Sequence, residues 1–172
     1  MYFREVTMAT NPLSGSSTKS YTDKLFDASK REDGTVDQDV FFQKVEDTLI
    51  ARGDTDTLLS KIAQNLIKKI IATQSLAETQ EFFTTVNKMT QSRKENTLLS
   101  GYLAFREVND LQWLALKIAQ DSSSGKDLYL CQLVEECKKT KNKEIALQAA
   151  NSIRHPGDKA KYLAKINYGN YF

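Results

Sequence analysis

Two pairs of helices are encoded in residues 113–166, WLALKIAQDSSSGKDLYLCQLVEECKKTKNKEIALQAANSIRHPGDKAKYLAKI. Apolar residues recur there at every third or fourth position, which is the period of an amphipathic helix. The helical segments are 111–120, 127–138, 143–153 and 159–167. Short polar stretches at 121–126 and 154–158, the second of which contains Pro156, join the two members of each pair. This alternation predicts two helical hairpins.

The same pattern continues toward the amino terminus. Residues 76–89 and 96–108 predict a third hairpin, joined by the polar stretch 90–95. Before it, residues 40–50 and 57–72 each predict an amphipathic helix. The sequence therefore predicts an all-α fold.

The three hairpins align with one another without gaps when the sequence is shifted by 32 residues. Six columns of this alignment contain only apolar residues, against about two expected by chance for a chain of this apolar content. The columns are Phe82/Leu114/Ala146, Phe83/Ala115/Leu147, Val86/Ile118/Ala150, Leu98/Leu130/Tyr162, Leu99/Cys131/Leu163 and Tyr102/Val134/Ile166. Because stacked hairpins can share a core that a single hairpin cannot form, we expect stacked antiparallel hairpins, a short α-solenoid. A helical bundle without a repeat is the alternative.

Residues 113–166 resemble the paired helices of tetratricopeptide-like and other α-solenoid repeats. The resemblance lies in Ala115-Leu116-x-x-Ala119 and Ala146-Leu147-x-x-Ala150. The Trp, Gly-x-x-Tyr and closing Pro positions of the tetratricopeptide consensus are not met, so the repeat is a degenerate one. The resemblance implies a scaffold of paired helices that binds another protein, and it assigns no ligand-binding residue.

The first 38 residues differ in composition from the rest of the chain. Residues 14–20 are small and polar, which predicts a flexible, partly disordered arm over 1–38, with one or two helical turns at 21–28. Residues 39–172 form the predicted helical domain. The chain starts without an apolar stretch of signal-peptide length, and no segment has the length of a membrane span. We therefore expect a cytoplasmic protein, or one secreted without a cleavable signal peptide, with no membrane insertion.

Charge and cysteine content restrict the partners and the compartment. Lys and Arg number 24 and Asp and Glu number 22, and a net charge of +2 gives too weak a field to attract nucleic acid. Cys131 and Cys137 lie six residues apart on one predicted helix, on different faces and too distant for a disulfide. Free thiols favour a reducing compartment.

Two loops resemble ligand-binding motifs but lack their essential residues. Residues 122–127, SSSGKD, are similar to the end of a phosphate-binding loop, although the first glycine is absent and Asp127 replaces Ser or Thr. We expect a hairpin loop there, with Asp127 as the N-cap of the next helix. The segment from Ser29 to Val40 resembles a calcium-binding EF-hand loop, with Ser29, Arg31 and Val40 at positions that normally supply oxygen ligands. We expect no calcium binding there.

No combination of residues predicts catalysis or a cofactor. His155 is the only histidine and neither cysteine has a partner at zinc-ligand spacing, so we expect no metal site. The leading hypothesis is a non-enzymatic protein-interaction module, namely an adaptor, an effector or a chaperone-like scaffold. The alternatives are a helical enzyme or small-ligand domain with a site formed by distant residues, and a homo-oligomer.

Polar residues that recur at the same spacing predict where another protein or a peptide binds. In stacked hairpins the first helices of successive units line one face. Gln80, Gln112 and Glu144 form one row on this face, and Lys88 with Gln120 form a second. We expect both rows to be exposed, to tolerate alanine and to bind a partner; solvated positions without a function are the alternative.

Overall fold

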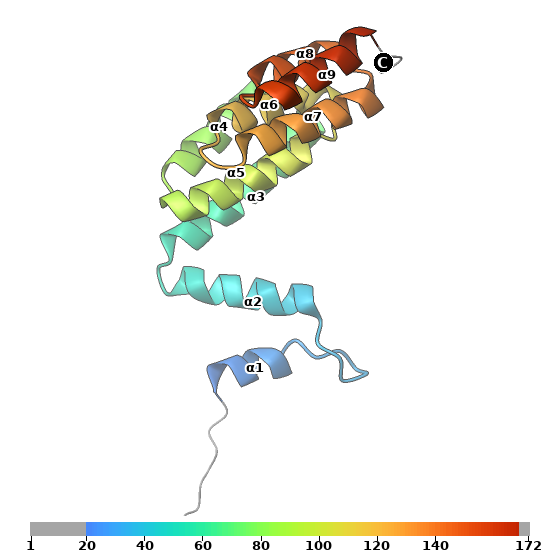
Figure 1. The fold of residues 1–172 in the computed structure, drawn as a ribbon. Coiled ribbons are helices and arrows are strands. Elements are labelled where there is room, and N and C mark those ends of the chain that lie inside the picture. The colour runs from blue at the N-terminus through green and yellow to red at the C-terminus, as the bar shows by residue number, and fades with distance from the viewer. Residues whose placement is uncertain (1–19, 169–172) are drawn as a thin grey trace, which may run out of the picture. The chain divides into compact units, whose positions relative to one another are not determined.

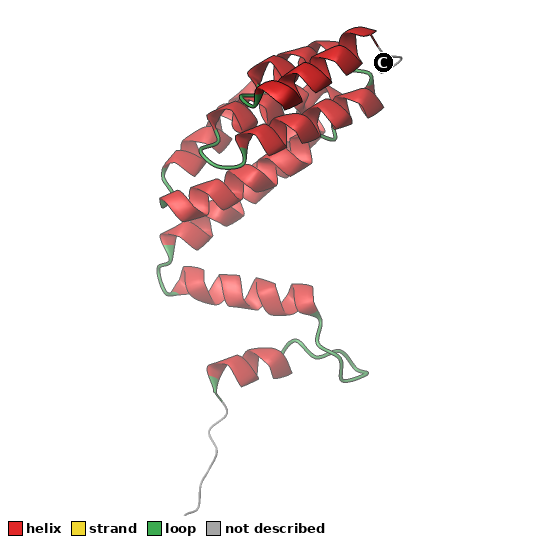
Figure 2. Ribbon diagram, in the orientation of Figure 1, coloured by secondary structure: helices red, strands yellow, loops and turns green. Residues whose placement is uncertain are grey.

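The structure is a computed structural model that describes residues 20–168 of the chain (Figure 1). The predicted all-α class is confirmed, because the described residues form helices and no strand (Figure 2). The α-helices are α1 (Tyr21–Asp27), α2 (Gln38–Ala51), α3 (Thr55–Thr73), α4 (Leu76–Asn87), α5 (Gln91–Phe105), α6 (Gln112–Asp121), α7 (Lys126–Thr140), α8 (Lys143–Ser152) and α9 (Pro156–Tyr168). A 3₁₀ turn, η1 (Asn109–Leu111), precedes α6.

The starts of α2, α3 and α6 differ from the prediction by one or two residues, and those of α5, α7 and α9 differ for identifiable reasons. Helix α5 begins at Gln91 rather than Asn96, because its first turn is polar and exposed and so carries no apolar period. Helix α9 begins at Pro156, in a segment predicted to be a loop. Proline suits the first position of a helix, where its missing N–H would have no helical partner. The N-cap of α7 is Gly125 rather than Asp127, which lies within the first turn.

The described residues divide into two compact units, 20–48 and 49–168, with the boundary inside α2. The predicted division into an arm over 1–38 and a helical domain over 39–172 stays a prediction. In the first unit, α1 and α2 are joined through stacked rings of Phe26 and Phe41, 4.4 Å apart, and through a 2.6 Å hydrogen bond between the hydroxyls of Tyr21 and Thr48. The predicted helical turns at 21–28 are confirmed. Residues 1–19 of the predicted arm lie outside the described residues.

The helices of the second unit pack mostly against their neighbours in sequence. The largest interfaces join α7 with α8, α3 with α4, α5 with α6, and α6 with α7. Helix α4 contacts α3 much more extensively than α5, whereas α5 contacts both α3 and α6. Helices α4 and α5 of the predicted hairpin therefore share only a small interface.

The buried hydrophobic side chains among the described residues all lie in the second unit. Three of the six predicted columns are buried throughout, and in the other three Ala115 and Leu130 are buried while the remaining side chains are half-buried against the core. The fully buried columns are Phe82/Leu114/Ala146, Val86/Ile118/Ala150 and Tyr102/Val134/Ile166. The phenol of Tyr102 donates a 2.6 Å hydrogen bond to the carbonyl of Tyr129. This bond links α5 to α7 inside the core.

No helix in residues 20–168 is long and apolar enough to cross a membrane.

Candidate functional site

A groove opens on the second unit where α4 separates from α5. It has a volume of about 770 Å³, and its walls come from one face of α4 and one face of α6, with two residues of α5 between them. The lining residues are Leu76, Thr79, Gln80, Phe83, Thr84, Val86, Asn87, Lys94, Leu98, Trp113, Lys117, Ile118 and Asp121. The residues of each wall recur at helical spacing, so the groove follows the helices rather than a loop.

Large apolar side chains of the groove are exposed to solvent. Trp113, the only tryptophan of the chain, has 42% of its surface exposed, and Leu76 has 68%. Phe83, which also lines the groove, is half-buried. Scattered apolar residues are common on protein surfaces, but several around one hollow are typical of binding sites.

Two lysines give the groove a positive rim. The Lys117 ammonium lies 5.7 Å from the centre of the Phe83 ring, and so reaches from α6 to α4. Lys94 of α5 donates a 2.8 Å hydrogen bond to the side-chain oxygen of Asn87 on α4. Asp121 is the single acidic residue of the lining. The ionisable groups of the lining therefore sum to a positive charge.

The structure brings only Gln80 of the predicted binding rows into this groove. Glu144, Lys88 and Gln120 are exposed, as expected, but lie outside the lining, and Gln120 donates a 2.9 Å hydrogen bond to Ser152. The expected exposure of Gln112 is wrong, because its side chain is fully buried. The first row is thus interrupted, and binding by its exposed members stays a prediction.

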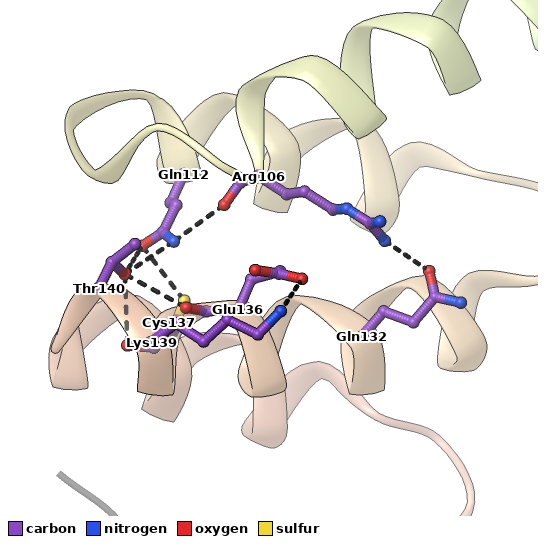
Figure 3. A network of polar contacts seen from close by, with 7 residues as sticks. All are labelled: Arg106, Gln112, Gln132, Glu136, Cys137, Lys139 and Thr140. Carbon is purple, nitrogen blue, oxygen red and sulfur yellow. Dashed lines mark hydrogen bonds and ion pairs between the residues drawn. The ribbon is translucent and has the colours of Figure 1, made fainter.

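Gln112 is the centre of a buried polar network between α6 and α7 (Figure 3). Its amide nitrogen donates 2.9 Å hydrogen bonds to the carbonyl of Arg106 and to the hydroxyl of Thr140. Its amide oxygen accepts from the same hydroxyl at 3.2 Å and from the thiol of Cys137 at 3.4 Å. A buried amide needs such partners, because an unpaired polar group costs free energy away from water.

Cys137, a member of this network, is fully buried. Burial raises the pKa of the Cys137 thiol to about 12. Burial likewise raises the pKa of Cys131, which is half-buried. The prediction that both cysteines are free thiols is confirmed. High pKa values disfavour the thiolate, which is the reactive form of cysteine.

The EF-hand-like loop of the first unit holds its polar groups in internal bonds. The hydroxyl of Ser29 donates to the carbonyl of Leu25, and Arg31 forms an ion pair with Asp37 at 3.0 Å. The hydroxyl of Thr35 donates to Asp33 and lowers the pKa of that carboxyl. The pKa of Asp37 is also lowered, mainly by the backbone N–H of Val40. The Asp33 carboxylate thus stabilises the loop, and the Asp37 carboxylate stabilises the start of α2.

We expect that calcium does not bind residues 29–40 at micromolar concentration. The Arg31 guanidinium lies against Asp37, so a cation would have to displace an attached positive charge and find oxygen ligands that the loop lacks. Isothermal titration calorimetry with CaCl₂ checks this, with MgCl₂ as the control for weak ionic effects. A micromolar, calcium-selective heat signal would show that the loop rearranges into a site.

The phosphate-loop-like segment is a hairpin loop, as expected. Ser123 hydrogen-bonds Glu95, and Lys126 donates to the carbonyl of Gln120 at 2.6 Å. Asp127 accepts hydrogen bonds from the backbone N–H groups of Arg154 and His155, which lower its pKa. Asp127 therefore connects the start of α7 to the start of α9. His155 is exposed beside Asp158.

Neither a metal-binding cluster nor a similarity to known proteins indicates a function for the described part of the chain. Among residues 20–168 there is no group of three or more His, Cys, Asp or Glu side chains placed to hold a metal ion. Comparisons of the chain with models of protein families, with curated proteins and with solved structures find no significant match.

Proposed function

We propose that this chain is a non-enzymatic protein-interaction module, in which stacked helical hairpins hold a groove for a segment of another protein. The observation that carries the proposal is the groove between α4 and α6, with Trp113 and Leu76 exposed in its walls. Tryptophan in a hollow is a frequent centre of binding energy, because it removes a large surface from water at a small cost in side-chain entropy.

The recurrence of apolar residues at a spacing of 32 supports the same proposal. Three of its six columns are buried in the hydrophobic core throughout. Scaffolds of this kind are stabilised by contacts between neighbouring hairpins, and they present the faces of successive helices as binding surfaces. In this chain, the groove is lined by α4, α5 and α6, and α4 and α5 share only a small interface.

Selection of a displayed random peptide library on the purified chain tests the proposal. We expect peptides whose binding weakens by about thirtyfold when Trp113 is replaced by alanine, the loss of about 2 kcal/mol typical of a binding hot spot. Fluorescence anisotropy of labelled peptides measures the affinity. Because Trp113 is partly exposed, the free energy of unfolding should change by no more than about 1 kcal/mol.

The matched control is Leu128→Ala. Leu128 is 59% exposed on α7 and does not line the groove, so this variant should bind the selected peptides like the parent chain. A selection that returns no peptide sensitive to Trp113→Ala, or peptides that lose affinity equally in Leu128→Ala, would rule out the groove as the binding site.

A further inference from the structure

We propose that the groove binds one amphipathic helix of a partner protein, about three turns long, with an apolar face against Phe83 and Trp113 and carboxylates beside Lys94 and Lys117. This inference rests on the proposed function and adds the conformation and the charge of the bound segment.

The length of the groove fits a helix of this size. Leu76, Gln80, Phe83 and Asn87 span almost all of α4, which at 1.5 Å per residue is about 16 Å. A helix about 10 Å wide and 16 Å long that sinks halfway into a groove occupies roughly 600 Å³. The volume of about 770 Å³ accommodates it.

Backbone hydrogen bonding favours a helix over an extended peptide. The walls are helices, whose backbone groups bond within each helix, and the described residues contain no sheet edge for strand addition. An extended peptide in this groove would leave many of its own N–H and C=O groups without protein partners. A helical peptide satisfies them internally and can offer the groove its side chains alone.

The charges of the groove favour an acidic helix. Lys94 and Lys117 contact the neutral Asn87 amide and the Phe83 ring, and neither forms an ion pair within the described part of the chain. With Asp121 as the only carboxylate of the lining, the groove attracts acidic segments and repels basic ones. Each such rim contact contributes about 0.2–1 kcal/mol, so charge selects among helices while the apolar face supplies most of the affinity.

Two synthetic helical peptides test the inference. They share Leu and Phe at helical spacing, and the flanking positions are Glu in one peptide and Lys in the other. As the only tryptophan, Trp113 reports occupancy of the groove through its emission. We expect the Glu peptide to shift this emission at a concentration at least about tenfold lower than the Lys peptide. The double variant Lys94→Glu/Lys117→Glu should reverse the order.

Two controls separate shape from charge. Lys68→Glu/Lys69→Glu makes the same change in net charge at exposed positions of α3 outside the groove, and should keep the preference for the Glu peptide. A Glu peptide with a central proline cannot form the helix and should lose binding.

The outcomes distinguish this inference from the proposed function. Equal or stronger binding of the Lys peptide would overturn the charge assignment, and equal binding of the proline peptide would overturn the helix. If none of the peptides binds, the inference fails, whereas displayed peptides that depend on Trp113 would still uphold the interaction role.

Discussion

Replacement of Leu130 by aspartate is expected to destabilise the second unit by at least about 4 kcal/mol, because an unpaired carboxylate would enter the core. Leu130 has no exposed surface and belongs to the cluster that contains the buried faces of α3 to α9. Losses of this size approach the whole stability of a small domain. Urea denaturation followed by circular dichroism at 222 nm measures the effect.

Leu128→Asp is the matched control for Leu130→Asp, since Leu128 lies one half-turn away on α7 and is 59% exposed. We expect a change below about 1 kcal/mol for that variant. If the aspartate variant of Leu130 yields no folded protein, Leu130→Ala should fold with a loss of about 2–5 kcal/mol. A Leu130 variant as stable as the Leu128 variant would mean that the observed packing is wrong.

The second large effect is expected for Gln112→Ala, which should cost about 3 kcal/mol in the free energy of unfolding. The substitution leaves a cavity and removes hydrogen bonds to the Arg106 carbonyl, the Thr140 hydroxyl and the Cys137 thiol. Each buried polar group that is left without a hydrogen-bond partner lowers the free energy of unfolding by about 1–3 kcal/mol. The same denaturation experiment measures the loss.

Gln120→Ala is the control within the same helix, because Gln120 is exposed and its bond to Ser152 lies at the surface. We expect a change within about 0.5 kcal/mol. Gln112→Met keeps most of the side-chain volume but removes the amide. We expect it to lose most of the stability that Gln112→Ala loses, which separates the contribution of the hydrogen bonds from that of the cavity. If Gln112→Ala melts like Gln120→Ala, the network contributes no net stability.

The helices and much of the core could be predicted from the sequence because both depend on local spacing. Phe82, Leu114 and Ala146 occupy equivalent positions in three helices, and all are buried. The period fails where a turn is polar, as at Gln91, where α5 begins ahead of its first apolar residue. It also fails to distinguish a proline in a loop from one at the start of a helix, as at Pro156.

The candidate site was less predictable because it depends on how helices lie relative to one another. The recurrence of polar residues predicts an exposed Gln112, whereas the structure buries it; the exposure of Trp113 in the groove follows from no pattern in the sequence. The buried Gln112 amide finds its hydrogen-bond partners in Arg106, Cys137 and Thr140. Arg106 follows the end of α5, and the other two lie on α7, so no regular spacing in the sequence connects them to Gln112. The small interface between α4 and α5 depends on how these helices are placed relative to each other, which the apolar period does not determine.

The sequential packing of the second unit also bears on how it folds. Most interfaces join helices that are adjacent along the chain, so their formation closes short loops and costs little chain entropy. Domains with such local contacts fold rapidly, in microseconds to milliseconds as a rough range. Helix α9 contacts mainly α8 and, to a smaller extent, α7. We therefore expect α9 to open while α3 to α6 stay assembled, so that its amide protons exchange with solvent before those of the central helices.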